Sequence, residues 1–289
     1  MGMEERAFPL RSSPMELVTI RQGAQTRAGR VEQDQVVLLD VPTVKEVLTD
    51  PDGLARAAVA DSGETVPLET ADLAPVVPKP DKIVCVGVNY RDHITEMGRE
   101  VPGHPTYFAK YARALVGPND DIVLPSPEIS GSVDWECELA VIIGRETRNI
   151  STADVLDHIA GFCVLNDVSV RDWQRRTGQF LAGKTFESLT PIGPTLVTTD
   201  QVGDGSGLAL TTTINGVVKQ ESNTDHLVFN VADIVADLSQ IMTLDPGDVI
   251  ATGTPGGVGA ARKPPEFLKP GDVVITSIDG VGTLTNSCR

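Results

Sequence analysis

Short apolar segments separated by turn residues run along most of the chain, a pattern that predicts strands. The strongest hairpin signal is Asn215-Gly216, which separates two such segments, 208–214 and 217–220. Helical periodicity is clearest over 230–242, where apolar residues recur every three or four positions. The other predicted strands cover 16–20, 29–31, 35–40, 82–87, 135–143, 161–166, 193–197, 248–252 and 273–278, and the other predicted helices cover 44–60, 151–159 and 170–177. Strands outnumber helices, so the pattern predicts an α+β fold that is mostly β.

The segment 74–80 contains three prolines in seven residues, a composition typical of linkers. Before it, short strands and a helix indicate a small α/β appendage. After it, hairpins outnumber crossovers, which favours a β-rich body over a doubly wound sheet. The sequence therefore predicts a small N-terminal domain over 1–75 and a larger domain over 76–289.

The chain has 289 residues, with 40 acidic and 24 basic side chains and a net charge of −16. Such a charge repels phosphate backbones and anionic membranes, so we expect neither a nucleic acid nor a membrane as partner. No apolar run reaches the roughly 18 residues of a membrane span, and the acidic start lacks the apolar region of a secretory signal. These features predict a cytoplasmic protein. The four cysteines are scattered, so disulfides and a thiolate zinc site are not expected.

Three carboxylates alternate with apolar residues at the start of a strongly apolar segment. On one continuous strand, Asp134, Glu136 and Glu138 would share a face. Like charges spaced this closely repel one another and raise one another's pKa unless a cation neutralises them. The alternative is a solvated face, but the following apolar residues favour burial. Asp167 ends another apolar strand, and oxygen ligands alone suit Mg²⁺ or Mn²⁺, with Ca²⁺ also acceptable.

His93 and Glu96 are three residues apart, which places them on one face of a helical turn. A carboxylate beside an imidazole orients it and raises its basicity, as a general base requires. The alternative is a surface histidine with a chance acidic neighbour. Lys184 can stay charged beside carboxylates and stabilise a developing enolate, or it can form only a salt bridge to a metal-site carboxylate.

The segment 178–185 matches the short pattern of a phosphate-binding P-loop. The mechanism of that loop needs a strand before it and a helix after it. Here a charged, helical stretch precedes the segment, and Pro191 and Pro194 follow soon after it. We therefore reject a P-loop and rank a nucleotidase last among the possible functions.

Several segments, in this order and spacing, resemble the fumarylacetoacetate hydrolase family. The resemblance extends from about residue 78 to 282, and the matching segments are 86–96, 115–118, 134–138, 166–174, 183–186, 191–194 and 243–259. It implies a β-roll or mixed β-sandwich that carries a divalent metal ion, and a homodimer.

The resemblance also implies roles for individual residues. The metal ligands that it implies are Glu136, Glu138 and Asp167. The catalytic residues that it implies are His93, Glu96 and Lys184. The substrate-binding residues that it implies are Gln174, Gly253 and Thr254. The alternative for Gln174 is an exposed helix residue, and the alternative for Thr254 is a turn residue.

The predicted activity is hydrolysis of the C3–C4 bond of a 2,4-dioxo acid, of the acylpyruvate or fumarylpyruvate type, to pyruvate and a carboxylic acid. In this hypothesis His93 and Glu96 activate a water, while the metal ion and Lys184 stabilise the pyruvate enolate. The same enolate arises when oxaloacetate is decarboxylated or a 2-hydroxydienoate is tautomerised, so these reactions are the alternative. A non-catalytic protein that binds Ca²⁺ ranks below both.

Overall fold

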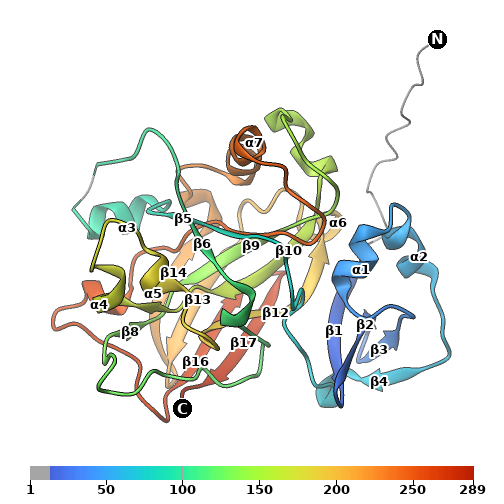
Figure 1. The fold of residues 1–289 in the computed structure, drawn as a ribbon, viewed down its shortest axis with the longest axis horizontal. Helices are drawn as coiled ribbons and strands as arrows, with labels where there is room; N and C mark the ends of the chain where they lie inside the picture. Colours follow the sequence, from blue (N-terminus) through green and yellow to red (C-terminus); the bar gives the residue numbers. More distant parts are fainter. Residues whose placement is uncertain (1–13, 99) are drawn as a thin grey trace.

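The computed structural model describes residues 14–98 and 100–289. Its largest sheet has eleven strands and contains both parallel and antiparallel pairs (Figure 1). The strands, in order across the sheet, are β4 (Thr65–Pro67), β3 (Gln35–Leu38), β2 (Gln25–Glu32), β1 (Glu16–Gln22), β12 (Thr190–Thr198), β10 (Ile159–Asn166), β9 (Cys137–Ile143), β15 (Val249–Ala251), β5 (Ile83–Gly87) and β6 (Thr106–Lys110), with β7 (Leu115–Val116) paired to β12. The prediction of a mostly β fold is confirmed.

A second, antiparallel sheet packs on the larger one, and a two-stranded ribbon lies beside them. The second sheet has the order β14 (Val217–Asn223), β13 (Ala209–Ile214), β16 (Val273–Ile278) and β17 (Gly282–Ser287), and the ribbon joins β8 (Val133–Asp134) to β11 (Ser169–Val170). Asn215 and Gly216 both have positive φ angles, of 51° and 78°, as a two-residue turn between paired strands requires. The predicted hairpin is confirmed.

Both faces of β9 are buried. Cys137, Leu139 and Val141 pack with the second sheet and α7, whereas Ala140 and Ile142 pack in a separate core on the opposite face. A strand that is buried on both faces needs apolar residues at successive positions, which explains the continuous apolar sequence of β9. Glu138 lies on the same face as Ala140, because side chains alternate along a strand.

The N-terminal strands β1 to β4 are part of the larger sheet. They connect to the rest of it through β1, which pairs with β12 at Glu16–Val197 and Leu17–Leu196. In Figure 1 these strands lie at one end of the molecule. The division at residue 75 stays a prediction. The predicted helix over 44–60 is two helices, α1 (Val44–Thr49) and α2 (Gly53–Val59). Pro51 accounts for the break, because the residue before a proline is driven out of the helical conformation.

The longest helix over the described residues is α7 (Val231–Ile241), where Asn230 and Asp233 form a capping box; this prediction is confirmed. The prediction over 151–159 is wrong in type, since a 3₁₀ helix, η3 (Thr152–Asp157), leads into β10. The prediction over 170–177 shortens to α4 (Arg171–Gln174). The remaining helices are α3 (Arg91–Glu96), α5 (Leu181–Lys184), α6 (Thr199–Val202), η1 (Leu68–Thr70), η2 (Ala112–Ala114), η4 (Thr224–His226) and η5 (Gly259–Ala261).

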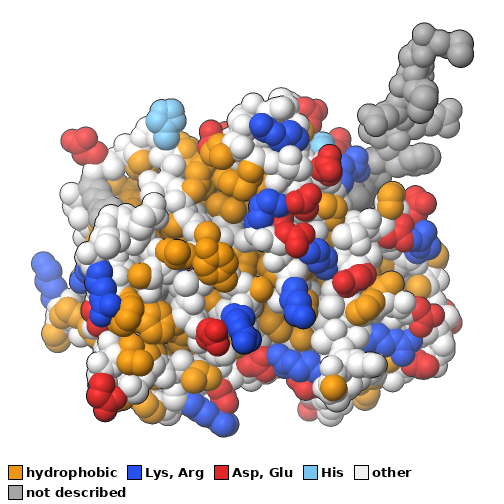
Figure 2. Space-filling model, in the orientation of Figure 1, with side chains coloured by type: hydrophobic (Ala, Val, Ile, Leu, Met, Phe, Trp, Pro, Cys, Tyr) orange, Lys and Arg blue, Asp and Glu red, His pale blue; other side chains and the backbone are white. Residues whose placement is uncertain are grey.

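Within the described residues, no helix has the length and apolar character needed to cross a bilayer. Figure 2 shows acidic and basic side chains interspersed with hydrophobic ones on the face that it presents.

The close approach of β10 to β12 gives a test of this packing. A Cβ atom on Gly161 would lie 2.0 Å from the carbonyl oxygen of Val197, which belongs to the backbone and cannot move aside. We expect Gly161→Ala to lower the free energy of unfolding by about 1–3 kcal/mol or more, as overpacked cores do. Gly131→Ala, where a Cβ meets nothing within 4 Å, should change it by less than about 0.5 kcal/mol. Denaturant unfolding measures both, and equal stabilities would contradict the packing.

Candidate functional site

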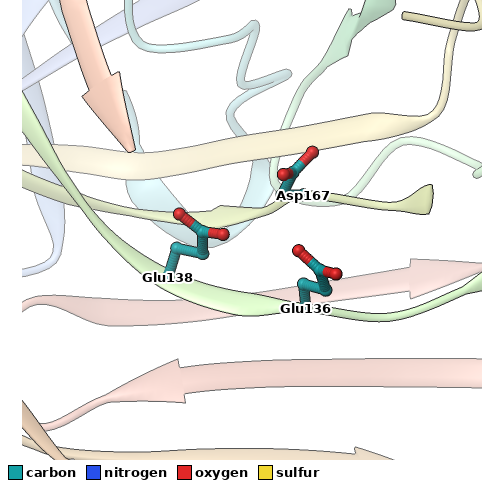
Figure 3. Close-up of side chains that lie close together, drawn as sticks. All are labelled: Glu136, Glu138 and Asp167. Atoms are coloured by element: carbon teal, nitrogen blue, oxygen red, sulfur yellow. The ribbon is translucent and has the colours of Figure 1, made fainter. Parts of the chain in front are cut away.

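Three buried carboxylates meet where β9 begins and β10 ends (Figure 3). The antiparallel register pairs Glu138 with Leu165, so the first residues of β9 lie beside the residue that follows β10. The backbone N–H of Asp167 also donates to the carbonyl of Glu136, at 2.8 Å. One carboxylate oxygen from each of Glu136, Glu138 and Asp167 lies within 4.8 Å of the others. We call these three residues the acidic triad, and its donor set can hold a divalent metal ion.

Asp134 does not share the face of the triad, so the prediction of one continuous strand is wrong. The strand is interrupted at 135–136, between β8 and β9. The Asp134 carboxylate instead accepts hydrogen bonds from the backbone N–H groups of Gly259 and Ala260, at 2.7 and 2.9 Å. It also pairs with Arg171 Nε at 2.8 Å. These bonds bring the residue onto the two-stranded ribbon and away from the triad.

Three buried cations surround the triad. Lys184 Nζ lies 2.7 Å from both Glu136 Oε2 and Asp167 Oδ2. Lys110 Nζ lies 2.6 Å from Asp167 Oδ1, and Arg171 Nη1 lies 2.7 Å from Glu136 Oε1. Burial alone would lower the pKa of Lys184, but the neighbouring Asp167 and Glu136 raise it above its ordinary value, so the ammonium group stays charged.

Glu138 is the triad member with the least compensation. Its Oε2 accepts the N–H of Gly253 at 2.7 Å, and no ion pair joins it to a cation within the described part of the chain. Burial, then Asp167 and Glu136, raise its pKa well above the ordinary value. Burial would also raise the pKa of Glu136, but Lys184 and Arg171 lower it. An excess of buried negative charge among oxygen donors fits a divalent cation held by the triad.

His93 and Glu96 form a hydrogen-bonded pair on α3, with His93 Nδ1 3.1 Å from Glu96 Oε2. The other oxygen, Oε1, accepts the N–H of Gly257 at 3.0 Å, so the carboxylate joins α3 to the glycine-rich loop (253–259). Burial would raise the pKa of Glu96, but the bonds from His93 and Gly257 lower it. The ionised carboxylate holds a proton on Nδ1 and leaves Nε2 as the basic nitrogen.

One cavity of about 460 Å³ contains most of the predicted site residues. Its polar lining is His93, Glu136, Glu138, Arg171, Gln174, Arg175, Thr177, Lys184 and Thr254. Among its apolar lining residues are Val86, Met97, Phe108, Phe180 and Val258. Three further predicted residues do not line the cavity but bond to residues that do: Glu96 to His93, Asp167 to Lys184 and Gly253 to Glu138. A cavity of this size, with charged groups at one side, suits a small organic acid.

The predicted substrate-binding residues lie in different settings. Gln174 Oε1 accepts a hydrogen bond from Arg171 Nη1 at 3.0 Å, so its amide N–H groups are left to donate. Thr254 Oγ1 accepts from Gln220 Nε2 at 2.9 Å, which leaves the hydroxyl hydrogen to donate. Gly253, by contrast, uses its N–H to hold Glu138. Binding of substrate by all three stays a prediction.

The sequence reasoning missed three residues that support the site. Lys110 follows Phe108 by two positions on β6, so both side chains lie on the same, buried face of the strand. A lysine at such a position is the sequence feature that could have indicated a buried ion pair. Arg171 lies within the segment 166–174, but its burial between two carboxylates depends on tertiary structure. Gln220 donates to Thr254 and accepts the N–H of Cys137 at 3.0 Å, and no sequence pattern indicates this.

Glu138→Gln tests the metal centre. The substitution keeps the shape of the side chain but removes a negative charge that has no ion pair among the residues that the structure describes. We expect the affinity for Mg²⁺ or Mn²⁺ to fall by about 100-fold or more. Mutation of a residue that only hydrogen-bonds a metal ligand typically lowers metal affinity by roughly 10–100-fold, and loss of a ligand should cost more. The metal-free protein should lose no stability. Titration calorimetry and thermal unfolding measure the two effects, with the exposed Glu128→Gln as control. Unchanged metal affinity would contradict the assignment.

Lys110→Met tests the buried ion pairs. Both partners are fully buried, and removal of one partner of such a pair costs about 3–5 kcal/mol. We expect the free energy of unfolding to fall by an amount near the lower end of this range, because Lys184 still pairs with Asp167. Lys269→Met, at an exposed position, should change stability by less than about 0.5 kcal/mol. If both variants unfold at the same denaturant concentration, Lys110 does not compensate the buried charge.

Comparisons with known proteins match this geometry. The family model described as fumarylacetoacetate (FAA) hydrolase C-terminal matches residues 82–289. The human protein named oxaloacetate tautomerase FAHD2A, mitochondrial, is 50% identical over 236 residues, which cover 81% of this chain and 74% of that protein. The Rattus norvegicus protein named oxaloacetate tautomerase Fahd2a, mitochondrial, is 47% identical over 234 residues, with the same shares covered.

Solved structures agree with the fold over nearly the whole chain. The fumarylacetoacetate hydrolase from Exiguobacterium antarcticum has a TM-score of 0.84 and 33% identity, and the match covers 95% of this chain and 99% of that chain. The 2-hydroxyhepta-2,4-diene-1,7-dioate isomerase from Mycobacterium marinum has a TM-score of 0.78 and 33% identity, and the match covers 95% and 98%. The resemblance found in the sequence is therefore confirmed: this chain belongs to the fumarylacetoacetate hydrolase family.

Proposed function

We propose that this protein is an enzyme that interconverts the keto and enol forms of oxaloacetate or of a closely similar 2-oxo dicarboxylate. The observation that carries the proposal is the 47–50% identity, over 81% of this chain, to proteins named oxaloacetate tautomerases. Hydrolysis of an acylpyruvate, the main expectation from the sequence, has weaker support from these relatives. The alternative, a decarboxylase of the oxaloacetate type or a 2-hydroxydienoate tautomerase that uses the same site, is better supported, and the names of these relatives favour a tautomerase.

The side chains around the cavity suit this proton transfer. When bound by the acidic triad, a divalent ion (Mg²⁺ or Mn²⁺) polarises a 2-oxo group and stabilises the charge of an enolate. Lys184 is held charged beside the triad, where it donates a hydrogen bond to the 2-oxo oxygen as negative charge develops there. Thr254 and Gln174 have hydrogen-bond donors left for the 1-carboxylate.

The proton itself passes through the His93–Glu96 pair. Nε2 of His93 removes a proton from C3 of the keto form, and the electron pair of that C–H bond becomes the second bond between C2 and C3. Glu96 keeps the proton on Nδ1 and stabilises the imidazolium that forms. The 2-oxo oxygen takes up a proton from solvent as the enol leaves, and His93 releases the proton on Nε2 to solvent. In the reverse direction His93 returns its proton to C3.

A second candidate is the isomerisation of a 2-hydroxydienoate, which the similarity to the M. marinum isomerase favours. That reaction also moves a proton to and from an enol, so it needs the same base and the same stabilisation of the enolate. Hydrolysis needs, in addition, a water placed to attack the carbonyl at C4. The cytoplasmic location and the homodimer stay predictions, and the names of the human and rat relatives assign those proteins to mitochondria.

The test is the decay of enol oxaloacetate, followed by the ultraviolet absorbance of the enol, with metal-stripped protein and with added Mg²⁺ or Mn²⁺. We expect metal-dependent acceleration. His93→Ala should lower kcat by about 10²–10⁴-fold, the usual contribution of a general base, with little change in metal affinity. His226→Ala, at an exposed position, should behave as wild type.

One result would refute the proposed function, and another would refute the proposed mechanism. The first is pyruvate release from a simple acylpyruvate without any acceleration of enol decay, which would restore the hydrolase. The second is full tautomerase activity in His93→Ala, which would remove His93 from the mechanism.

A further inference from the structure

The short helix α4 presents one face to the cavity. Arg175 closes its last turn, with its N–H bonded to the carbonyl of Arg171 at 3.1 Å. Residues three and four apart on a helix share a face, so Arg171, Gln174 and Arg175 all line the cavity. Arg176 is the next residue and lies on another face, where its guanidinium stacks on the Trp173 ring at 3.3 Å from the centroid.

Arg175 differs from the other cations of the cavity because its charge is uncompensated. Lys184 and Arg171 are each held by buried carboxylates at 2.7–2.8 Å. No hydrogen bond or ion pair engages the Arg175 side chain among the residues that the structure describes, although it is exposed and lines the same cavity. A free guanidinium at the wall of a ligand cavity is a geometrically suited partner for a carboxylate.

We propose that Arg175 binds the distal carboxylate of a 2-oxo dicarboxylate and thereby selects dicarboxylates over monocarboxylates. The inference rests on the proposed function, which places the 1-carboxylate and the 2-oxo group at the triad and C3 at His93. The remaining carboxylate of a four-carbon substrate then extends along the cavity away from the triad. Arg175 lies four residues, about 6 Å of helical rise, beyond Arg171, which contacts Glu136 of the triad.

The charges of the site agree with a dianionic substrate. The buried cluster consists of four carboxylates, the triad and Asp134, and three cations, Lys110, Arg171 and Lys184. A divalent ion would give this cluster one net positive charge, and Arg175 adds a second, whereas the ionised Glu96 beside His93 contributes one negative charge. The cluster and the ion offset the charge at the chelating end of a substrate, so only a substrate with a second, distal carboxylate also supplies a partner for Arg175.

The experiment compares two unreactive probes on the metal-loaded protein by titration calorimetry. Oxalate is also a dianion, but both of its carboxylates belong to the chelating end and it has no distal group. 3,3-Difluorooxaloacetate adds the distal carboxylate and has no C3 hydrogen to lose. We expect Arg175→Gln to weaken binding of difluorooxaloacetate by about tenfold and to leave oxalate within about twofold. Arg175→Lys should recover part of the loss, because lysine keeps the positive charge but lacks the paired N–H donors with which a guanidinium binds both oxygens of a carboxylate. Arg176→Gln is the matched control and should change neither affinity.

Kinetics with oxaloacetate provide an independent readout. Loss of a contact made equally in the ground state and the transition state raises KM about tenfold and changes kcat little. Equal weakening of both probes in Arg175→Gln, or no weakening of either, would overturn the inference. A wild-type protein that binds difluorooxaloacetate through Arg175 but does not accelerate enol decay would instead refute the proposed function and leave the inference standing.

Discussion

Three carboxylates are buried where β9 begins and β10 ends, and a fourth, Asp134, is buried beside them on β8. Three cationic side chains hold all four in place. Removing charged groups from water is costly, so such a cluster survives only if each charge has a well-placed partner. Lys110, Arg171 and Lys184 come from three different segments, β6, α4 and α5. Their pairing therefore fixes these elements against the central sheet. Glu138 has the weakest compensation, and the cluster can accommodate a divalent metal ion at that point.

The surrounding core keeps this arrangement rigid. β9 and β10 are buried on both faces, with apolar residues from the second sheet and α7 on one side and a separate core on the other. A strand packed in this way cannot slip by one residue without moving apolar side chains onto the wrong face. The positions of Glu136 and Glu138 are thus set by packing far from the cavity. The site is a consequence of how the central strands are covered.

Much of the site could be predicted because its residues lie in short, informative segments. Glu136, Glu138 and Asp167 stand at the ends of apolar strands, and His93 and Glu96 are one helical turn apart. The prediction failed at Asp134, because the strand break beside it depends on hydrogen bonds from a loop more than a hundred residues away. Local periodicity carries no information about such a contact.

The supporting residues were hidden for a related reason. Lys110 becomes the partner of Asp167 only when β6 and β10 are brought into one sheet. The short helix α4 also differs from its prediction, because four residues are too few for periodicity to define their faces. Arg171 acquires its partners through tertiary structure, and the role that we propose for Arg175 rests on its place at the cavity. The sequence presents both residues only as part of a charged stretch.

The anchoring of Glu96 has a consequence for the order in which the site matures. Its contact with His93 spans three residues, but its contact with Gly257 spans 161. Long-range contacts form only after a large entropic cost of chain closure. The imidazole and its carboxylate can meet on an isolated turn, but the bond from Gly257 that orients the carboxylate requires the glycine-rich loop, which lies far along the chain. The proton transfer that we propose for this pair therefore requires the completed fold.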